Sequence, residues 1–330
     1  LQESRAALIA AKETCPDIPV MVTMTFESDG RSLFGTDAAT AAIVLSSLGA
    51  AAVGAHCSTG PDQMAEVIRR MAKVTDIPII AKPNAGLPSL DEKGQTVYDM
   101  GPEEFGADME LLLDAGAQIL GGCCGTTPEF IRLLNGVFAD CQPGRTDHPM
   151  QSVICSPVSC VNVDVITVVG ERINPTGKKL MKAALREKDI NYLIKEGIAQ
   201  KDKGAHILDV NVGLPEIDEP AMMQQALFAL QGVLDLPLQI DTSDVEAMEV
   251  GLRHYNGKAM LNSVNGKQES MHAVFPLVKK YGAVVVCLCL DESGIPPTAE
   301  GRIAIAKKII ATAAEYGIPK HQLVFDALVM

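Results

Sequence analysis

Residues 205–241, AHILDVNVGLPEIDEPAMMQQALFALQGVLDLPLQID, contain the pattern that decides the fold. Two aliphatic runs, 205–212 and 236–241, flank a helical pattern at 220–230. Short aliphatic runs that alternate with helices are typical of buried parallel strands joined by helical crossovers. This stretch therefore predicts an α/β fold built around a parallel sheet.

The same alternation fills the first part of the chain. Strands are expected at 18–26, 51–57, 77–83 and 117–123, and helices at 37–48, 62–74, 102–114 and 128–138. Four such units make half of an eight-stranded barrel rather than a whole one. We therefore expect residues 1–140 to form one incomplete barrel of the TIM type.

The second part of the chain repeats the alternation after a break. Strands are expected at 165–171, 205–212, 236–241, 258–263, 283–290 and 323–329, and helices at 178–186, 191–203, 220–230, 245–254, 268–281 and 299–316. Residues 141–157 include three prolines, a glycine and no helical period, which predicts a linker over 141–162. The predicted fold is two incomplete (β/α)8 barrels, 1–140 and 163–330; one doubly wound domain would have too many units.

Composition excludes several classes of function. The net charge is −13, which argues against a surface for nucleic acid or anionic lipid. The longest apolar run, 283–290, is too short to span a bilayer, and residues 1–12 have no signal-peptide pattern. Nine cysteines without an export signal favour metal or thiol chemistry over a disulfide framework, so we expect a cytoplasmic protein.

Three cysteines follow predicted strands in glycine-rich segments. Residues 54–61, GAHCSTGP, contain Cys57, and residues 121–126, GGCCGT, contain Cys123 and Cys124. Three thiolates leave one tetrahedral position open, as in catalytic zinc sites, and the glycines are expected to give the backbone the freedom to gather them. The alternatives are buried apolar cysteines, which we expect at the chain's other six cysteines, or a disulfide between Cys123 and Cys124.

These segments resemble the two zinc signatures of the homocysteine S-methyltransferase family. Residues 24–26, MTF, and 82–88, KPNAGLP, are similar to further parts of that family, in the same order. The resemblance covers about residues 1–138 and implies that Cys57, Cys123 and Cys124 bind zinc, with homocysteine sulfur at the open position. His56 stands where the family usually has Asn, and we leave it out of the ligand set because it points to the opposite side of its strand from Cys57.

Polar clusters end the predicted strands of the second part. They are 170–177 (GERINPTG), 208–213 (LDVNVG), 239–243 (QIDTS), 261–263 (LNS) and 290–296 (LDESGIP). Asp and Asn directly after buried runs are costly unless a partner satisfies them, and the edge of a flat heterocycle is such a partner. The alternative for each is a helix N-cap.

The clusters resemble the pterin-binding family, which includes dihydropteroate synthases and methyltetrahydrofolate methyltransferases. The resemblance implies that Asp209, Asp241, Asn262 and Asp291 hold the pterin ring, with Asn174 nearby. It implies no catalytic residue beyond the zinc site.

The order of the two segments resembles that of the cobalamin-dependent methionine synthase family. This implies methyl transfer from 5-methyltetrahydrofolate, through cobalamin on a separate domain or protein, to zinc-activated homocysteine, giving methionine and tetrahydrofolate. Two alternatives stay open: a dihydropteroate synthase-like enzyme fused to a thiol methyltransferase, and a non-catalytic zinc- and folate-binding remnant.

The resemblance also implies that the chain is an internal fragment. Its first residue is Leu1 rather than Met. The first four strands of the homocysteine barrel, with the acidic groups for the substrate's amino group, are expected before Leu1. Residues 1–140 would then be the C-terminal half of that barrel, and 163–330 the N-terminal part of the pterin barrel. The closing strands of the second barrel, with an Asn near the reacting nitrogen, are expected after Met330.

Overall fold

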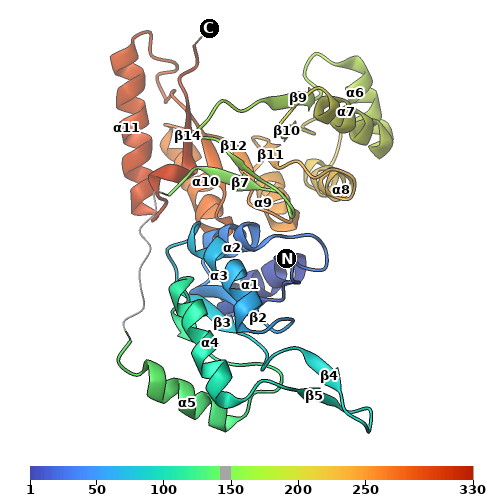
Figure 1. Cartoon of the computed structure of the whole chain (residues 1–330). Coiled ribbons are helices and arrows are strands. Elements are labelled where there is room, and N and C mark those ends of the chain that lie inside the picture. The colour runs from blue at the N-terminus through green and yellow to red at the C-terminus, as the bar shows by residue number, and fades with distance from the viewer. Residues whose placement is uncertain (142–149, 330) are drawn as a thin grey trace. The chain divides into compact units, whose positions relative to one another are not determined.

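The computed structural model describes residues 1–141 and 150–329, which form two compact units (Figure 1). The first unit comprises Leu1–Met150 and the second Gln151–Met330. Each unit is an α/β structure with its own parallel sheet. The boundary between the units falls inside the segment 141–162.

The first unit is a run of βα units with one added hairpin. Its elements are α1 (Gln2–Thr14), β1 (Met21–Met24), α2 (Ala38–Ser47), β2 (Ala52–His56), α3 (Pro61–Ala72), β3 (Ile79–Lys82), β4 (Pro88–Leu90), β5 (Thr96–Tyr98), α4 (Pro102–Asp114), β6 (Ile119–Leu120) and α5 (Pro128–Phe138). The parallel sheet has the order β1-β2-β3-β6, and β4 pairs with β5 as an antiparallel hairpin.

Local chemistry explains where these helices start. Proline opens α3, α4 and α5, because it lacks the N–H that the first helical turn leaves without a partner. Asp37 caps α2 by accepting from the backbone N–H of Thr40. Gly54 lets β2 lie close to β3, since a Cβ atom there would be 1.9 Å from the carbonyl oxygen of Ile80.

The second unit has a longer sheet of the same kind. Its elements are β7 (Val153–Cys155), β8 (Cys160–Asn162), β9 (Val169–Ile173), α6 (Lys179–Glu187), α7 (Ile190–Asp202), β10 (Ile207–Val210), α8 (Glu219–Gln231), β11 (Leu238–Asp241), α9 (Val245–His254), β12 (Met260–Asn265), α10 (Gln268–Tyr281), β13 (Val284–Leu288), α11 (Ala299–Glu315), the 3-10 turn η1 (Lys320–Gln322) and β14 (Leu323–Asp326). Strands β9 to β14 lie side by side in chain order.

The β7–β8 hairpin covers the amino end of this sheet. Ile154 of β7 packs in a buried cluster with Ile207, Met260 and Val284, the first residues of β10, β12 and β13. The carboxyl ends of the strands, where the polar clusters lie, are therefore at the opposite edge. Barrel and open α/β enzymes build their sites at that edge.

The predicted fold of two incomplete barrels is confirmed. Within the described residues each sheet is open, with consecutive parallel strands as neighbours and helices between them. The four-stranded sheet has β1 and β6 at its edges, and the six-stranded sheet has β9 and β14.

Several predicted strands are shorter in the structure, such as β1 and β14, and three local predictions differ more clearly. The strand expected at 165–171 lies at Val169–Ile173, because pairing with β10 sets its register and leaves Ile166 96% exposed. The strand expected at 117–123 is only Ile119–Leu120, because its register with β3 ends at Leu120. The last part of the predicted linker 141–162 forms the β7–β8 hairpin. Residues 142–149 of that linker lie outside the described residues.

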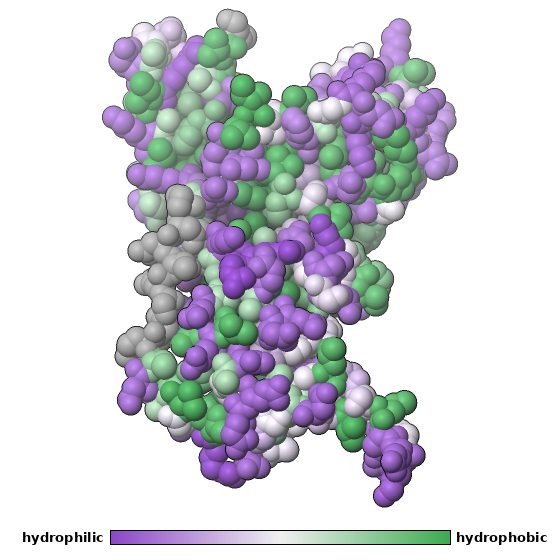
Figure 2. All heavy atoms as spheres, viewed as in Figure 1, coloured by the Kyte–Doolittle hydropathy of each residue, from purple (hydrophilic) through white to green (hydrophobic). Residues whose placement is uncertain are grey.

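Hydrophobic and hydrophilic residues are interspersed on the viewed face of both units (Figure 2). The turn of the β4–β5 hairpin carries Asp91, Glu92 and Lys93, which give it a hydrophilic tip. Among the helices described, none combines the length and apolar character that a membrane crossing needs.

Candidate functional site

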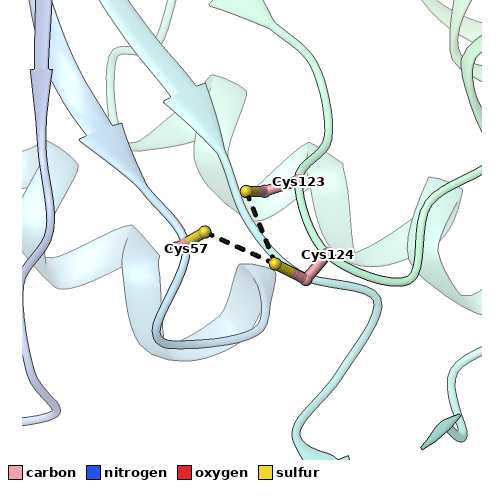
Figure 3. A group of neighbouring side chains, drawn as sticks. All are labelled: Cys57, Cys123 and Cys124. Atoms are coloured by element: carbon pink, nitrogen blue, oxygen red, sulfur yellow. Dashed lines mark hydrogen bonds between the residues drawn. The ribbon is translucent and has the colours of Figure 1, made fainter. Parts of the chain in front are cut away.

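The first unit gathers three thiols at the carboxyl edge of its sheet (Figure 3). Cys57 directly follows β2, and Cys123 and Cys124 follow β6, with β3 between those two strands. The Sγ atom of Cys124 lies 3.6 Å from that of Cys57 and 3.8 Å from that of Cys123. All three sulfur atoms lie within 4.8 Å of one another.

This spacing matches one tetrahedral metal ion. Sulfur atoms bound at about 2.3 Å to the same tetrahedral zinc are about 3.8 Å apart. The soft thiol donors are also those that zinc takes in proteins. Of the alternatives, Cys123 and Cys124 are not joined by a disulfide, and none of the three is buried as an apolar core cysteine would be.

Backbone bonds to the end of β3 position two of the thiols. The N–H of Cys57 donates to the carbonyl of Lys82 at 3.1 Å, and the N–H of Cys123 donates to that of Pro83 at 2.8 Å. Cys57 and Ser58 have φ angles of 58° and 60°, in the left-handed region. That conformation costs about 1–2 kcal/mol for a residue with a side chain, and such strain is concentrated at functional sites.

The expected role of the glycines holds for only part of the set. Gly125 has a φ of 82°, and a Cβ atom there would lie 2.5 Å from the Tyr98 ring. A Cβ atom on Gly122 would lie 2.5 Å from the side chain of Thr126. Gly121 has neither a positive φ nor a close contact, because the chain is still in line with β6 there. Gly125 and Gly122 are therefore the positions where glycine is required.

Asn84 and Tyr98 support Cys124 from the β3–α4 segment. The side-chain oxygen of Asn84 accepts from the N–H of Cys124 at 3.2 Å, and Asn84 itself is buried. The carbonyl of Cys124 accepts from the N–H of Ala85 at 2.9 Å. The prediction from sequence did not include Asn84 or Tyr98, although Asn84 lies inside the 82–88 segment that carried the resemblance.

Burial and hydrogen bonds shift the pKa of Cys57 and that of Cys124 in opposite directions. Burial, with hydrogen bonds to Cys123 and Cys124, raises the pKa of Cys57 to about 12. Hydrogen bonds from Cys57 and Tyr98 lower the pKa of Cys124. Three thiolates would repel one another here without a cation, and a bound divalent ion reverses that balance.

His56 ends β2, and its side-chain contact is with Thr25 rather than with the thiols. Its Nε2 atom lies 3.3 Å from the hydroxyl oxygen of Thr25. Burial, together with the nearby charge of Lys82, lowers its pKa. Its Nδ1 atom is buried without a hydrogen-bond partner in the described residues.

The second unit brings Asp209 and Asp241 into one polar cluster. Asp209 lies in β10 and is 2% exposed, and Asp241 ends the neighbouring strand β11. Gln239 donates from its side-chain amide to Asp209 Oδ1, and Asn211 donates to Asp241 Oδ2 at 2.9 Å. Asn211 and Gln239 lie in the polar segments 208–213 and 239–243, but their roles were not predicted, because their partners lie on an adjacent strand.

Hydrogen bonds offset only part of the cost of burying these two carboxyl groups. Burial and the neighbouring Asp241 raise the pKa of Asp209 to about 7, although the bond from Gln239 opposes this shift. Burial also raises the pKa of Asp241, against the bond from Asn211. Asp209 Oδ2 is buried with no hydrogen-bond partner among the described residues. An unsatisfied buried carboxyl oxygen is costly, which indicates a place for a ligand's polar group.

The helix-cap alternative does not apply to this pair. Asp218 caps α8 and Asp244 caps α9, each by accepting from a backbone N–H three residues later. Asp209 and Asp241 lie in the strands themselves and accept from side-chain amides instead. Their position is therefore explained by the cluster rather than by helix initiation.

The other three predicted pterin residues have different surroundings. Asn262 lies opposite Asp241 in the register of β12 and β11. Asn174 is buried and accepts from the N–H of Thr176 at 2.8 Å, as in a local turn. Asp291 accepts from the N–H of Ser293 at 2.8 Å in the turn after β13 and lines a cavity of about 470 Å³ beside α11. The contacts thus unite Asp209 and Asp241, place Asn262 beside them, and give Asn174 and Asp291 local partners.

The expectation that the other six cysteines are buried holds for half of them. Cys155, Cys287 and Cys289 are buried, and Cys15, Cys141 and Cys160 are exposed. The exposed ones lie at a helix end, beyond a helix end and in a short hairpin strand, where little of the chain packs over them.

Two family models match the chain, one for each unit. Residues 1–138 match the model described as homocysteine S-methyltransferase, and residues 170–330 match that described as pterin binding enzyme. The chain is thus similar to these two families, one after the other, and each match covers a little less than half of it. Both resemblances inferred from the sequence are therefore confirmed at the level of the family.

The curated relatives combine both segments. Methionine synthase of Mycobacterium leprae (strain TN) is 30% identical over 347 residues, covering 99% of this chain and 29% of that protein. Methionine synthase of Mycobacterium tuberculosis (strain ATCC 25618 / H37Rv) is 31% identical over 321 residues, covering 94% of this chain and 27% of that protein. The chain thus spans less than a third of the length of these relatives.

Dihydropteroate synthases are among the solved structures to which the chain has a low similarity. The enzyme of Xanthomonas albilineans has a TM-score of 0.42 at 18% identity, covering 53% of this chain and 64% of its own. The enzyme of Vibrio fischeri ES114 has a TM-score of 0.39 at 15% identity, covering 54% of this chain and 68% of its own.

Proposed function

We propose that this chain is the substrate-activating part of a methionine synthase. Its first unit would bind zinc and homocysteine, and its second unit would bind 5-methyltetrahydrofolate. The methyl group would pass between them through a cobalamin carried by another domain or protein, giving methionine and tetrahydrofolate. The gathering of Cys57, Cys123 and Cys124 carries this proposal, with the relatedness to methionine synthases in support.

In the first unit the three thiols would hold zinc and leave one position for a substrate thiol. Zinc bound there would lower the pKa of that thiol and so supply a nucleophile at neutral pH. The chain's own part is to hold the three sulfur atoms at the required spacing. The left-handed backbone at Cys57 and the bonds from Cys57 and Cys123 to the end of β3 hold the thiol-bearing loops in place.

In the second unit Asp209 and Asp241 would bind the pterin edge. An aminopyrimidine presents N–H donors, and carboxyl oxygens accept them. Within the described part of the chain Asp209 Oδ2 is buried and accepts no hydrogen bond, while Gln239 holds Asp209 Oδ1 and Asn211 holds Asp241 Oδ2. Asn262, opposite Asp241 on β12, would add an amide that can both donate and accept.

Metal substitution tests the first half of this proposal directly. The purified chain would be loaded with Co²⁺, whose thiolate complexes absorb visibly, and then titrated with homocysteine. We expect one metal ion per chain, a thiolate-to-metal absorption, and a further spectral change as the substrate sulfur occupies the open position. A chain that retains no metal, or whose spectrum does not respond to homocysteine, would contradict the proposal.

A separate titration tests the second half. Binding of 5-methyltetrahydrofolate would be measured by calorimetry on the same preparation, with and without metal. We expect folate binding that does not depend on the metal, because the Asp209–Asp241 cluster and the thiols lie in different units.

A further inference from the structure

The β7–β8 hairpin brings together two cysteines that the proposed function does not use. Cys155 ends β7 and Cys160 begins β8, and the two lie directly opposite each other in the antiparallel register. Their Sγ atoms are 2.9 Å apart. This is closer than either sulfur contact of the thiol cluster, at 3.6 and 3.8 Å.

The backbone of Cys155 shows which kind of cross-strand pair this is. Its N–H donates to the carbonyl of Lys258 at 2.9 Å, and its carbonyl accepts from the N–H of Lys258 at 3.0 Å. Both groups therefore point away from Cys160. In such non-hydrogen-bonded pairs the Cα atoms are about 4.5 Å apart and the side chains are closest. A disulfide spans Cα separations of about 4.4–6.8 Å, so this pair can close without moving the strands.

The two thiols differ in access to solvent. Cys160 is exposed, whereas Cys155 is fully buried at 0%. A reagent in solution can therefore reach Cys160 first, and Cys155 lies directly behind it. This is the arrangement of an attacking thiol with a neighbouring resolving thiol.

A buried lysine lies beside the pair. Lys258 is only 4% exposed. Burial lowers its pKa, and its interaction with Cys155 and Cys160 opposes that effect. A cation next to thiols favours their thiolate form, which is the form that reacts.

We propose that Cys155 and Cys160 form a reversible disulfide, which makes the β7–β8 hairpin a redox modification site. The oxidant would be a small-molecule disulfide. The Cys160 thiolate attacks one of its sulfur atoms, forms a mixed disulfide and releases one small thiolate. The Cys155 thiolate then attacks Cys160 Sγ and releases the second. The protein pair loses two electrons and two protons, and the small disulfide gains them as two thiols.

The site is separate from the proposed chemistry. The hairpin covers the amino ends of β10, β12 and β13, whereas Asp209 and Asp241 lie toward the carboxyl edge of their strands. The thiol cluster belongs to the other unit. Oxidation of the hairpin can thus be measured without reference to methyl transfer.

Peptide mass analysis of the full chain tests the proposal, because trypsin isolates the pair. Residues 146–172 lie between Arg145 and Arg172 with no Lys or Arg inside, and they contain only Cys155 and Cys160 among the nine cysteines. The chain would be treated with a small-molecule disulfide, denatured, alkylated and digested. We expect this peptide to be unalkylated and lighter by two hydrogen atoms, and to regain two alkyl groups after prior reduction.

Two variants distinguish the roles of the cysteines. In Cys155→Ser the exposed Cys160 should keep the mixed disulfide, because no thiol remains behind it to displace the small thiol. In Cys160→Ser the buried Cys155 should stay a free thiol, as Cys287 should in every sample. Wild-type chain in which 146–172 takes up two alkyl groups, keeps a mixed disulfide or links to another cysteine would overturn the proposal. This outcome is measured on the wild-type chain, so it does not depend on the folding of either variant.

Discussion

The Sγ atom of Cys57 lies 3.6 Å from that of Cys124, although 67 residues separate them. The parallel sheet produces this contact, since β2 and β6 both flank β3 and both end at the same edge. The end of β3 also accepts backbone hydrogen bonds from Cys57 and Cys123, which sets how far each loop extends. The proposed metal site therefore depends on strand order more than on either loop alone.

Replacing any one of the three cluster cysteines by Ala should abolish stoichiometric zinc. Two thiolates hold zinc poorly where the remaining positions are open to water. Metal content would be measured by mass spectrometry after dialysis against a weak chelator. Cys15→Ala, which removes an exposed cysteine of the same unit, is the matched control and should keep its zinc. Full retention by Cys124→Ala would show that the ligand set is wrong.

Gly125→Ala should damage the thiol site and destabilise the first unit by about 1–3 kcal/mol. The substitution puts a side chain at a φ of 82° and a Cβ atom 2.5 Å from the Tyr98 ring. Gly136→Ala is the control, because it lies within α5 with open space around it. Alanine there should be neutral or stabilise by about 0.5–1 kcal/mol. Urea unfolding and zinc content of both variants check this, and equal effects would refute the role given to Gly125.

Asp241→Ala should weaken binding of 5-methyltetrahydrofolate about tenfold or more. A lost hydrogen bond between a charged group and a buried donor costs about 1.5–3 kcal/mol. Calorimetric titration would measure the change, with zinc content and homocysteine binding expected to stay as in the wild type. Asp235→Asn, which alters an exposed carboxylate of the same unit paired with Lys201, should bind folate normally. Parallel loss of both ligands would indicate misfolding instead.

Asp209→Asn should stabilise the folded chain more at pH 8 than at pH 5. The pKa of Asp209 is raised from 3.8 to about 7, so the folded state holds a proton that the unfolded state has released. In the wild type, the protonated Asp209 therefore contributes fully to the free energy of unfolding below about pH 4. This contribution is lost as the pH rises toward 7. The amide has no charge to desolvate, so the difference in unfolding free energy should grow by roughly 1 kcal/mol or more. Urea unfolding at both pH values tests this, and a difference that shrinks with pH would contradict it.

Much of the fold follows from local patterns. Aliphatic runs such as 236–241 and proline at the starts of α3, α4 and α5 act within a few residues, so their consequences are visible in the sequence. The cysteine segments are distinctive for the same reason. The two hairpins escaped prediction because their strands are only three residues long and depend on their partner for structure.

The sequence by itself determined the βα order, the open parallel sheets and the identity of the three clustered thiols. Only the tertiary structure decided which polar groups meet: Asn211 with Asp241, Gln239 with Asp209, and Cys155 with Cys160. The physical reason is register. Which side chains meet across two strands depends on the pairing register of those strands. A shift of the register by one residue would turn every side chain of a strand to the opposite face of the sheet. That alignment results from the packing of the whole unit, which no short segment encodes.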